Sequence, residues 1–393
     1  MIRNHQPSPF NPGYGRKPAV FGGHRQAISE LSAVFETLDF GENQSVLVSG
    51  LRGAGKTAML SLLQDHAMGH GWLVISDDAS RGLMDRVMKS TIPRIRNALS
   101  EPAHNRLSSF SIGQFGVSWE QAGAAREAAP LLRHDLKALS DALEGRGGLL
   151  ITIDEVSSGR TRLRELSRFA LEIQHALTSG ANIMVVFAGI QVDLNELLKH
   201  EHNTFLRRSR RLDFRRLTPD ETRYVIAETT SLGGRSVAPA ALDHLTSISQ
   251  GYPYLIQLVG DYAWRRTPDA PVISIEDADY ALERGIKAVQ DRVISRVYDD
   301  LSERDKDFLR AMAQDEGRTR IADLKARMDA YDQYVQVYKR RLIDTGYVQS
   351  AGHGYVEFSL PYLDQYIKSL IDEEARGSRP PADPWGDFPP PRI

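Results

Sequence analysis

A glycine-rich run early in the chain has the residue types and spacing of a phosphate-binding loop. The run is Gly50-Leu51-Arg52-Gly53-Ala54-Gly55-Lys56-Thr57, which matches G-x-x-x-x-G-K-[ST] in full. Glycines let backbone N–H groups curl around a phosphate, and the N-terminus of the following helix adds partial positive charge. Lys56 can reach β- and γ-phosphates, and the Thr57 hydroxyl can ligate Mg²⁺. The predicted nucleotide-binding residues are Gly50, Arg52, Gly53, Ala54, Gly55, Lys56, Thr57 and Ala58.

A second set of candidate residues lies at the end of an apolar run. Residues 149–153 are Leu-Leu-Ile-Thr-Ile, and Asp154 and Glu155 follow directly. At the carboxyl edge of a parallel sheet, Asp154 would lie beside the phosphate loop and hold Mg²⁺ directly or through water. Glu155 would then polarise the attacking water as a general base. With the phosphate loop, this pair predicts Mg²⁺-dependent ATP hydrolysis, in which Lys56 and Glu155 are catalytic.

The elements that must position these residues alternate between strand and helix. Apolar strand patterns cover residues 44–49, 72–76, 148–153 and 182–188, with helical patterns between most of them. Strands that are apolar on both faces indicate a parallel sheet covered by helices on both sides. Residues 110–119 alternate around glycines and predict a small hairpin or loop insertion. From residue 218 the pattern is helical, which predicts a helical lid.

The last third of the chain begins a separate pattern. Ser302 and Asp305 resemble a capping pair ahead of an apolar helix, and two more helices follow. A glycine-rich turn at 351–354 joins two short strand patterns. Three helices and a two-stranded hairpin predict a winged helix. We expect an α/β P-loop fold in four parts: a core with an N-terminal arm (1–215), a helical lid (216–285), a winged helix (286–375) and a disordered proline-rich tail (376–393).

Composition limits the classes of function. The 393 residues carry 49 Lys and Arg against 51 Asp and Glu, which argues against coating nucleic acid through bulk positive charge. No cysteine is present, which excludes disulfides, zinc–thiolate sites, iron–sulfur ligation and a cysteine nucleophile. No apolar run reaches the ~18–20 residues that a membrane span needs. The polar N-terminus does not read as a secretory signal, so we expect a cytoplasmic protein.

The phosphate loop and the acidic strand end resemble those of the AAA+ ATPases. The likeness is to the bacterial and archaeal ATPases that share features with origin-recognition initiators and STAND NTPases, and it spans roughly residues 8–370. The run Gly251-Tyr252-Pro253-Tyr254-Leu255-Ile256-Gln257 looks like the G-x-P element in the lid of this branch. The resemblance implies that Pro253 contacts the nucleotide. The run Phe21-Gly22-Gly23-His24-Arg25 is similar to an altered form of the motif that lies against adenine.

The resemblance also implies two residues that act on the γ-phosphate. Members of the family carry a small polar sensor after the strand at 182–188, and Gln191 is the nearby polar candidate. An arginine finger is expected in the basic run at 207–211. Arg208 is our choice for a catalytic finger, with Arg207 and Arg211 as alternatives, and a basic solvated loop is the competing interpretation. A finger that acts between copies would imply a homo-oligomer.

The partner of the winged helix stays open at the level of sequence. Lys339, Arg340 and Arg341 end the predicted recognition helix, which could enter the major groove of duplex DNA. Residues 302–376 nevertheless hold 12 basic and 14 acidic side chains, so the domain lacks overall positive charge. A protein partner is the alternative. Tyr331, Tyr334 and Tyr338 have helical spacing and are predicted to pack in a core or a domain contact.

Overall fold

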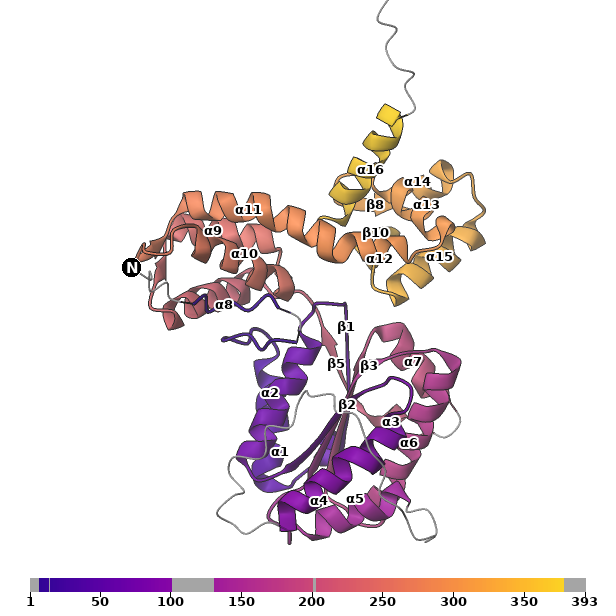
Figure 1. Ribbon diagram of the computed structural model, residues 1–393. Coiled ribbons are helices and arrows are strands. Elements are labelled where there is room, and N and C mark those ends of the chain that lie inside the picture. Colours follow the sequence, from indigo (N-terminus) through magenta and orange to yellow (C-terminus); the bar gives the residue numbers. More distant parts are fainter. Residues whose placement is uncertain (1–6, 14, 101–130, 201–202, 378–393) are drawn as a thin grey trace, which may run out of the picture. The chain divides into compact units, whose positions relative to one another are not determined.

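The computed structural model describes residues 7–13, 15–100, 131–200 and 203–377 (Figure 1). The predicted hairpin at 110–119 and almost all of the predicted tail lie outside the described residues. The chain divides into two compact units, which are described separately below. Unit 1 is Met1–Leu282 and unit 2 is Glu283–Ile393. The predicted core and almost all of the predicted lid fall in unit 1, so the four-part division stays a prediction.

Unit 1 contains a five-stranded sheet in the order β2-β3-β4-β1-β5, with every pair parallel. The phosphate-loop strand β1 and the acidic strand β3 are therefore separated by one strand, β4. Their carboxyl ends meet at the same edge of the sheet. The strands are β1 (Ser45–Gly50), β2 (Leu73–Asp78), β3 (Leu149–Val156), β4 (Ile183–Gly189) and β5 (Arg210–Phe214).

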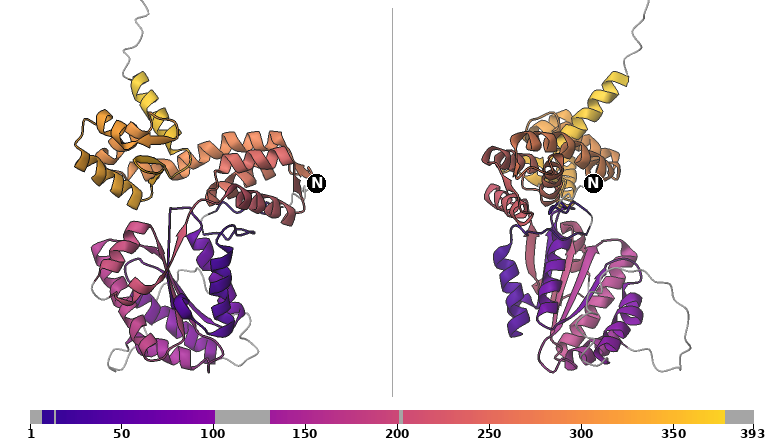
Figure 2. Two further views of the ribbon diagram at one scale, coloured as in Figure 1. Left: turned by 180° about the vertical axis from the view of Figure 1, so that it is seen from behind. Right: turned by 60° about the vertical axis from the view of Figure 1, so that its left-hand side comes forward.

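Helices cover both faces of this sheet, which confirms the predicted α/β fold (Figure 2). Val46 and Val48 pack with α1 and α2 on one face, and Leu47 packs with α3 to α7 on the other. This alternation explains why the strands are apolar on both faces. The elements are α1 (Arg25–Thr37), η1 (Gly41–Gln44), α2 (Lys56–Gly69), α3 (Leu83–Arg86), η2 (Val87–Thr91), α4 (Ile92–Ser100), α5 (Leu132–Asp141), α6 (Arg160–Thr178), α7 (Gln191–Lys199) and η4 (Phe205–Arg208).

The rest of unit 1 is mainly helical, as the sequence predicts. Helix α8 begins with a capping box, in which the Thr218 hydroxyl accepts from the Glu221 N–H and the Glu221 carboxylate accepts from the Thr218 N–H. Two short parallel strands, β6 and β7, were not predicted, because two residues are too few to show a strand period. The elements are α8 (Pro219–Leu232), β6 (Ser236–Val237), α9 (Pro239–Ser249), α10 (Pro253–Arg266), β7 (Val272–Ile273) and α11 (Ile275–Val289), which begins in unit 1 and ends in unit 2.

Unit 2 combines helices with a small antiparallel sheet. The predicted hairpin is present, but a third strand, β8, pairs with β10 and completes the order β8-β10-β9. The predicted cap is confirmed, because the Ser302 hydroxyl accepts from the Asp305 N–H. The elements are η5 (Gln290–Ile294), α12 (Ser295–Asp299), α13 (Glu303–Met312), β8 (Arg318–Arg320), α14 (Ile321–Arg327), α15 (Asp332–Asp344), β9 (Val348–Ser350), β10 (Tyr355–Phe358) and α16 (Leu363–Gly377).

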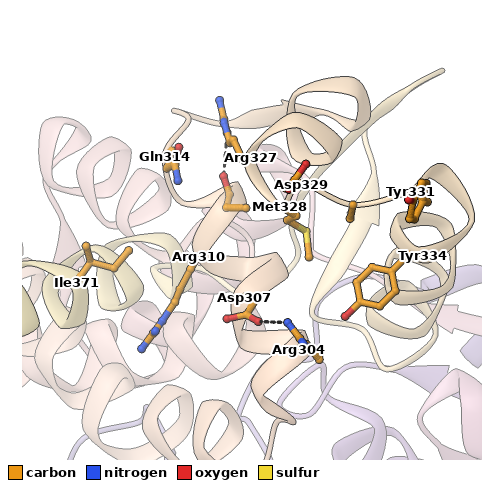
Figure 3. Close-up of a pocket in the computed structure, with 12 residues that line it drawn as sticks. Arg304, Asp307, Arg310, Gln314, Arg327, Met328, Asp329, Tyr331, Tyr334 and Ile371 are labelled. Carbon is orange, nitrogen blue, oxygen red and sulfur yellow. Dashed lines mark hydrogen bonds and ion pairs between the residues drawn. The ribbon is translucent and has the colours of Figure 1, made fainter.

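Of the three aromatic residues at α15, Tyr331 does not pack as predicted, whereas Tyr334 and Tyr338 are half-buried, with ring centroids 4.6 Å apart. Tyr331 is 87% exposed, so it belongs to no core. Tyr331 and Tyr334 border a surface groove of about 550 Å³, and Arg304, Arg310 and Arg327 also line it (Figure 3).

No helix in the described ranges is both long and apolar enough to cross a membrane.

Candidate nucleotide-binding site

The predicted phosphate loop joins β1 to α2, as its chemistry requires. Gly53 and Gly55 have φ angles of +78° and +95°, a region that glycine enters without strain. The Lys56 ammonium donates to the carbonyl oxygens of Gly50 and Leu51, each at 2.8 Å. The side chain therefore lies along the loop, and Thr57 and Ala58 follow it in the first turn of α2. Loop, lysine and helix N-terminus form one candidate anion site.

Burial governs the charge of Lys56. It lowers the pKa of the ammonium to about 8, and Arg52 acts in the same direction, whereas Asp154 and Glu155 raise it. Desolvation disfavours the charged form unless an opposite charge compensates it. The negative charge of a bound phosphate would supply that compensation. Lys56 is thus a lysine whose protonation would respond to an anion bound by the loop.

The two predicted metal ligands are brought into direct contact. The Thr57 hydroxyl donates to Oδ2 of Asp154 at 2.6 Å, although the residues lie on different elements. Hydroxyl and carboxylate oxygens are the hard donors that Mg²⁺ prefers. No group of three or more His, Asp or Glu side chains in the described ranges could form a separate metal cage. A Mg²⁺ ion held by one or two protein oxygens plus phosphate fits this donor set.

Glu155 lies in an irregular part of β3. The β3–β4 register shifts between Ile153 and Val156, and Glu155 has φ of +51°. Its N–H donates to Oδ1 of Asp154 at 2.8 Å, and its side chain is exposed. Bulges re-aim side chains, and positive φ at a non-glycine residue stores strain, which often marks functional sites. Asp154 contacts Thr57 while the Glu155 side chain is exposed, so the two acids can serve different roles.

Residues of the helical part of unit 1 reach the loop. A Cβ added at Gly55 would lie 4.0 Å from Cβ of Pro253, so this predicted contact residue packs beside the loop. The neighbouring Tyr252 is 1% exposed, and its hydroxyl donates to the Arg52 carbonyl. Sequence reasoning missed this contact, because a tyrosine inside an apolar run is normally taken for core packing. The G-x-P run itself was the signal that could have pointed to it.

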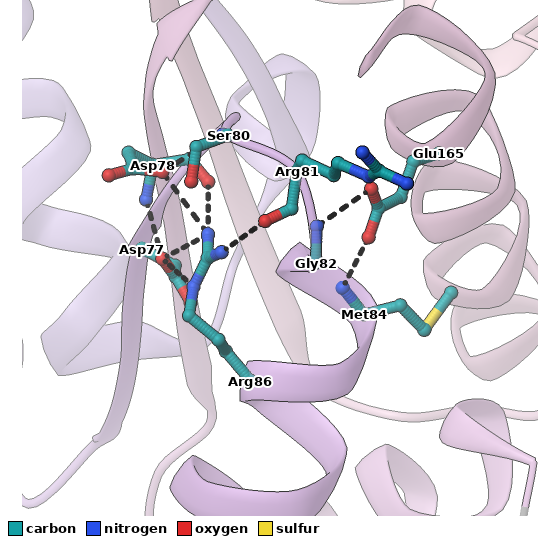
Figure 4. Close-up of polar contacts among 8 residues, drawn as sticks. All are labelled: Asp77, Asp78, Ser80, Arg81, Gly82, Met84, Arg86 and Glu165. Carbon is teal, nitrogen blue, oxygen red and sulfur yellow. Dashed lines mark hydrogen bonds and ion pairs between the residues drawn. The ribbon is translucent and has the colours of Figure 1, made fainter. Parts of the chain in front are cut away.

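A polar network beside β3 was also missed. In Figure 4, Arg86 bridges Asp77 and Asp78 at the end of β2, with shortest distances of 2.8 and 3.1 Å. Asp78 pairs in register with Asp154, so the network lies next to the acidic strand end. Glu165 on α6 accepts from the N–H groups of Gly82 and Met84, at 2.9 and 3.2 Å. These contacts fix the loop after β2 beside the edge of the sheet that carries Asp154.

The predicted γ-phosphate sensor lies at this edge but is engaged locally. Gln191 begins α7 directly after β4, whose end lies between β1 and β3. Its side-chain amide donates to Oδ1 of Asn195 at 3.1 Å. Contact with a γ-phosphate would require that bond to be exchanged. Gln191 is therefore in the right place for a sensor, while its role stays a prediction.

The arginine run lies at the other edge of the sheet. Arg210 and Arg211 open β5 and pair with Val46 and Leu47, whereas the loop follows Gly50 at the far end of β1. Four strand residues span about 13 Å, and Arg208 lies farther away still. The Arg207 Nε donates to the Leu198 carbonyl at 3.0 Å. The structure does not bring these arginines to Lys56 and Glu155 of the same chain.

Comparison with known proteins agrees with this geometry. Residues 21–186 match the AAA ATPase domain, and residues 291–367 match a domain of unknown function (DUF8462). A Walker-type ATPase of Pyrococcus abyssi is similar in structure, with a TM-score of 0.62 at 13% identity over 90% of this chain and 97% of that one. The ORC2 protein of Aeropyrum pernix, solved in ADPNP–ADP complexes, is also similar in structure. Its TM-score is 0.60 at 15% identity, over 93% of this chain and 98% of that one. No curated protein is a significant match.

The chain therefore contains an AAA ATPase domain at residues 21–186, and its fold is similar to that of these two solved proteins. The predicted family and the predicted ATPase activity are confirmed. The domain match runs from before β1 into β4 and so contains the phosphate loop, Asp154 and Glu155. The individual roles of these residues, and the role of unit 2, go beyond that assignment.

Proposed function

We propose that this chain is an ATP-driven switch, in which the nucleotide state of unit 1 governs partner binding by unit 2. The observation that carries the nucleotide part is the Thr57–Asp154 hydrogen bond, which joins the phosphate loop to the acidic strand end. Pro253 and Tyr252 also meet the loop from the helical part of unit 1. A nucleotide bound there would touch both parts, so that hydrolysis would change their contacts.

Each site residue has a distinct role in this proposal. Lys56 holds the β- and γ-phosphates, together with the N–H groups of the loop. Thr57 and Asp154 hold Mg²⁺, which neutralises charge on the phosphate oxygens when it is bound. Glu155 accepts a proton from the attacking water as a general base. Gln191 senses the γ-phosphate once its bond to Asn195 is exchanged.

Unit 2 is proposed to be a winged helix that docks on a protein. Its order of helix, strand, two helices and two strands supports that fold. Two of the three cations on α15 have acidic partners, because Arg341 contacts the buried Asp305 at 3.0 Å and Arg340 lies 3.8 Å from Asp344. Tyr331, the N-cap residue of α15, is 87% exposed, and Val337 on α15 is 62% exposed. Exposed aromatic and apolar side chains favour a protein surface.

Duplex DNA is the second candidate partner. Arg340 supports it, because this side chain is 86% exposed and its weak pair with Asp344 would not prevent contact with a phosphate. Arg341 is a poor probe of this role, because its removal would leave the buried carboxylate of Asp305 without its cation. Lys339 and Arg340 are the residues to test.

Hydrogen exchange tests both parts of the proposal in one experiment. In full-length Glu155→Gln protein, exchange over residues 303–358 should differ between the ATP and ADP states, and Lys56→Ala should abolish the difference. Duplex DNA at low salt should leave α15 unprotected. Identical exchange in the two nucleotide states would refute the switch. Salt-sensitive protection of α15 by DNA, lost in Lys339→Ala/Arg340→Ala protein, would assign DNA as the partner.

The arginine run is proposed to act between copies of the chain. Arg208 is exposed and lies beyond reach of its own phosphate loop. Arg208→Ala should lower ATP hydrolysis at least tenfold and change ATP affinity little, because a guanidinium stabilises charge that develops during phosphoryl transfer. Wild-type specific activity should rise with protein concentration.

Mixing two inactive variants provides the decisive measurement for Arg208. Glu155→Gln and Arg208→Ala proteins together should recover activity, at sites that pair an intact Glu155 with a neighbour's intact Arg208. No recovery, combined with a concentration-independent rate, would show that no arginine acts across copies. Normal hydrolysis by Arg208→Ala protein alone would move the test to Arg207 and Arg211.

A further inference from the structure

Tyr252 is a buried polar residue that the ATPase chemistry described above does not use. It is the N-cap residue of α10 and is 1% exposed. Burial raises the pKa of its hydroxyl, so the group remains a proton donor at every physiological pH. The hydroxyl donates to the Arg52 carbonyl, in the middle of the phosphate loop. The hydroxyl thus links α10 directly to the backbone of the loop.

The chain before Tyr252 holds it in place. The Leu217 N–H donates to the Gly251 carbonyl at 2.7 Å. Gly251 has φ of +70°, and a Cβ there would lie only 3.1 Å from the Leu217 backbone nitrogen. This close approach ties the start of α10 to the segment that leaves β5. Since β5 pairs with β1, the tyrosine is positioned relative to the loop by the sheet itself.

Three consecutive carbonyl groups of the loop accept hydrogen bonds from side chains. Gly50 and Leu51 accept from Lys56, and Arg52 accepts from Tyr252. A trans peptide places its C=O and N–H in opposite directions. The Tyr252 hydrogen bond therefore turns the N–H of Gly53 away from the tyrosine. The N–H groups of Gly53 and Gly55 have no acceptor in the described part of the chain, so they are free to meet a phosphate.

We propose that Tyr252 is a positioning residue for nucleotide binding. By holding the Arg52 carbonyl, its hydroxyl orients the Gly53 peptide so that the N–H is presented to the phosphates of ATP. The tyrosine also makes the loop depend on the placement of α10. This inference rests on the proposed nucleotide site around Lys56, but it assigns a separate function to a residue outside the loop.

The test is Tyr252→Phe in the full-length chain, because phenylalanine keeps the ring and removes only the donor. KM for ATP and the ATP dissociation constant should each rise about tenfold, the usual scale for one lost hydrogen bond. kcat should stay within about twofold of wild type, because the oriented N–H serves ground state and transition state alike. Calorimetry, steady-state kinetics and the melting temperature are measured together.

A matched control separates positioning from packing. The Tyr254 hydroxyl has no hydrogen-bond partner in the described ranges, so Tyr254→Phe should keep the wild-type affinity. A Tyr252→Phe protein with a lower melting temperature and unchanged ATP affinity would overturn the inference, as would a fall in kcat at constant KM. Lys56→Ala protein shows whether a negative result concerns only Tyr252 or the nucleotide site as a whole. If it too bound ATP normally, the nucleotide site itself would be wrong.

Discussion

Glu155→Gln protein should bind ATP as tightly as wild type and hydrolyse it about 10²–10⁴ times more slowly. The amide has the shape of the carboxylate but cannot accept the proton of the attacking water. The backbone that positions residue 155 should survive the change, since its N–H is held by Oδ1 of Asp154 and its φ of +51° belongs to the bulge in β3. Asp154 and Thr57 would still hold the metal.

Phosphate release in single-turnover experiments measures this effect directly. A suitable control is Glu196→Gln, because Glu196 lies on α7 and pairs with Lys199 on the surface. The control should hydrolyse ATP at the wild-type rate. If Glu155→Gln and Glu196→Gln released phosphate equally fast, Glu155 would not be the base. An equal loss in binding and hydrolysis would instead assign Glu155 to nucleotide binding.

The sequence was sufficient wherever function depends on a contiguous motif. Gly50 to Thr57 must form a strand-to-helix turn to bind a phosphate, and the structure has that turn. The acidic end of β3 was equally predictable, because an apolar run followed by Asp154 and Glu155 marks the carboxyl edge of a buried parallel strand. In both cases the chemistry and the local fold are specified by the same few residues.

Contacts between residues far apart in the sequence could not be predicted in this way. The place of the arginine run follows from the pairing of β5 with β1, and no local pattern specifies which strands are neighbours. The Tyr252–Arg52 contact joins residues 200 positions apart. Strand β8 has only three residues, too few to show alternation. Arg341 resembled a surface cation until its contact with the buried Asp305 became visible.

Lys56→Ala protein should lose tight ATP binding altogether, by at least about 100-fold. The ammonium directly follows the last glycine of the loop, where it can meet the β- and γ-phosphates. It donates to the carbonyls of Gly50 and Leu51, so it is already placed within the loop. Lys17→Ala is the matched control, because Lys17 pairs with Asp65 on α2. Unchanged ATP affinity in the Lys56→Ala protein would refute the site.

The pKa of Lys56 adds a signature that wild-type protein should display. Burial lowers this pKa to about 8, whereas bound phosphate would raise it again. Below about pH 7 the lysine is charged in both states, so binding takes up no proton. Above pH 8 the free lysine is mostly neutral, so ATP binding must take up a proton, and affinity should fall as the pH rises, by up to tenfold per unit.

Calorimetry at pH 6.5 and pH 8.5, in two buffers with different ionisation enthalpies, counts that proton. His24 does not contribute at the higher pH, because burial lowers its pKa below the ordinary value for histidine. Uptake approaching one proton at pH 8.5, with none at pH 6.5, is the expected result. Equal proton uptake at both values would mean that the Lys56 ammonium does not meet the phosphates, even if the alanine variant bound ATP poorly for another reason.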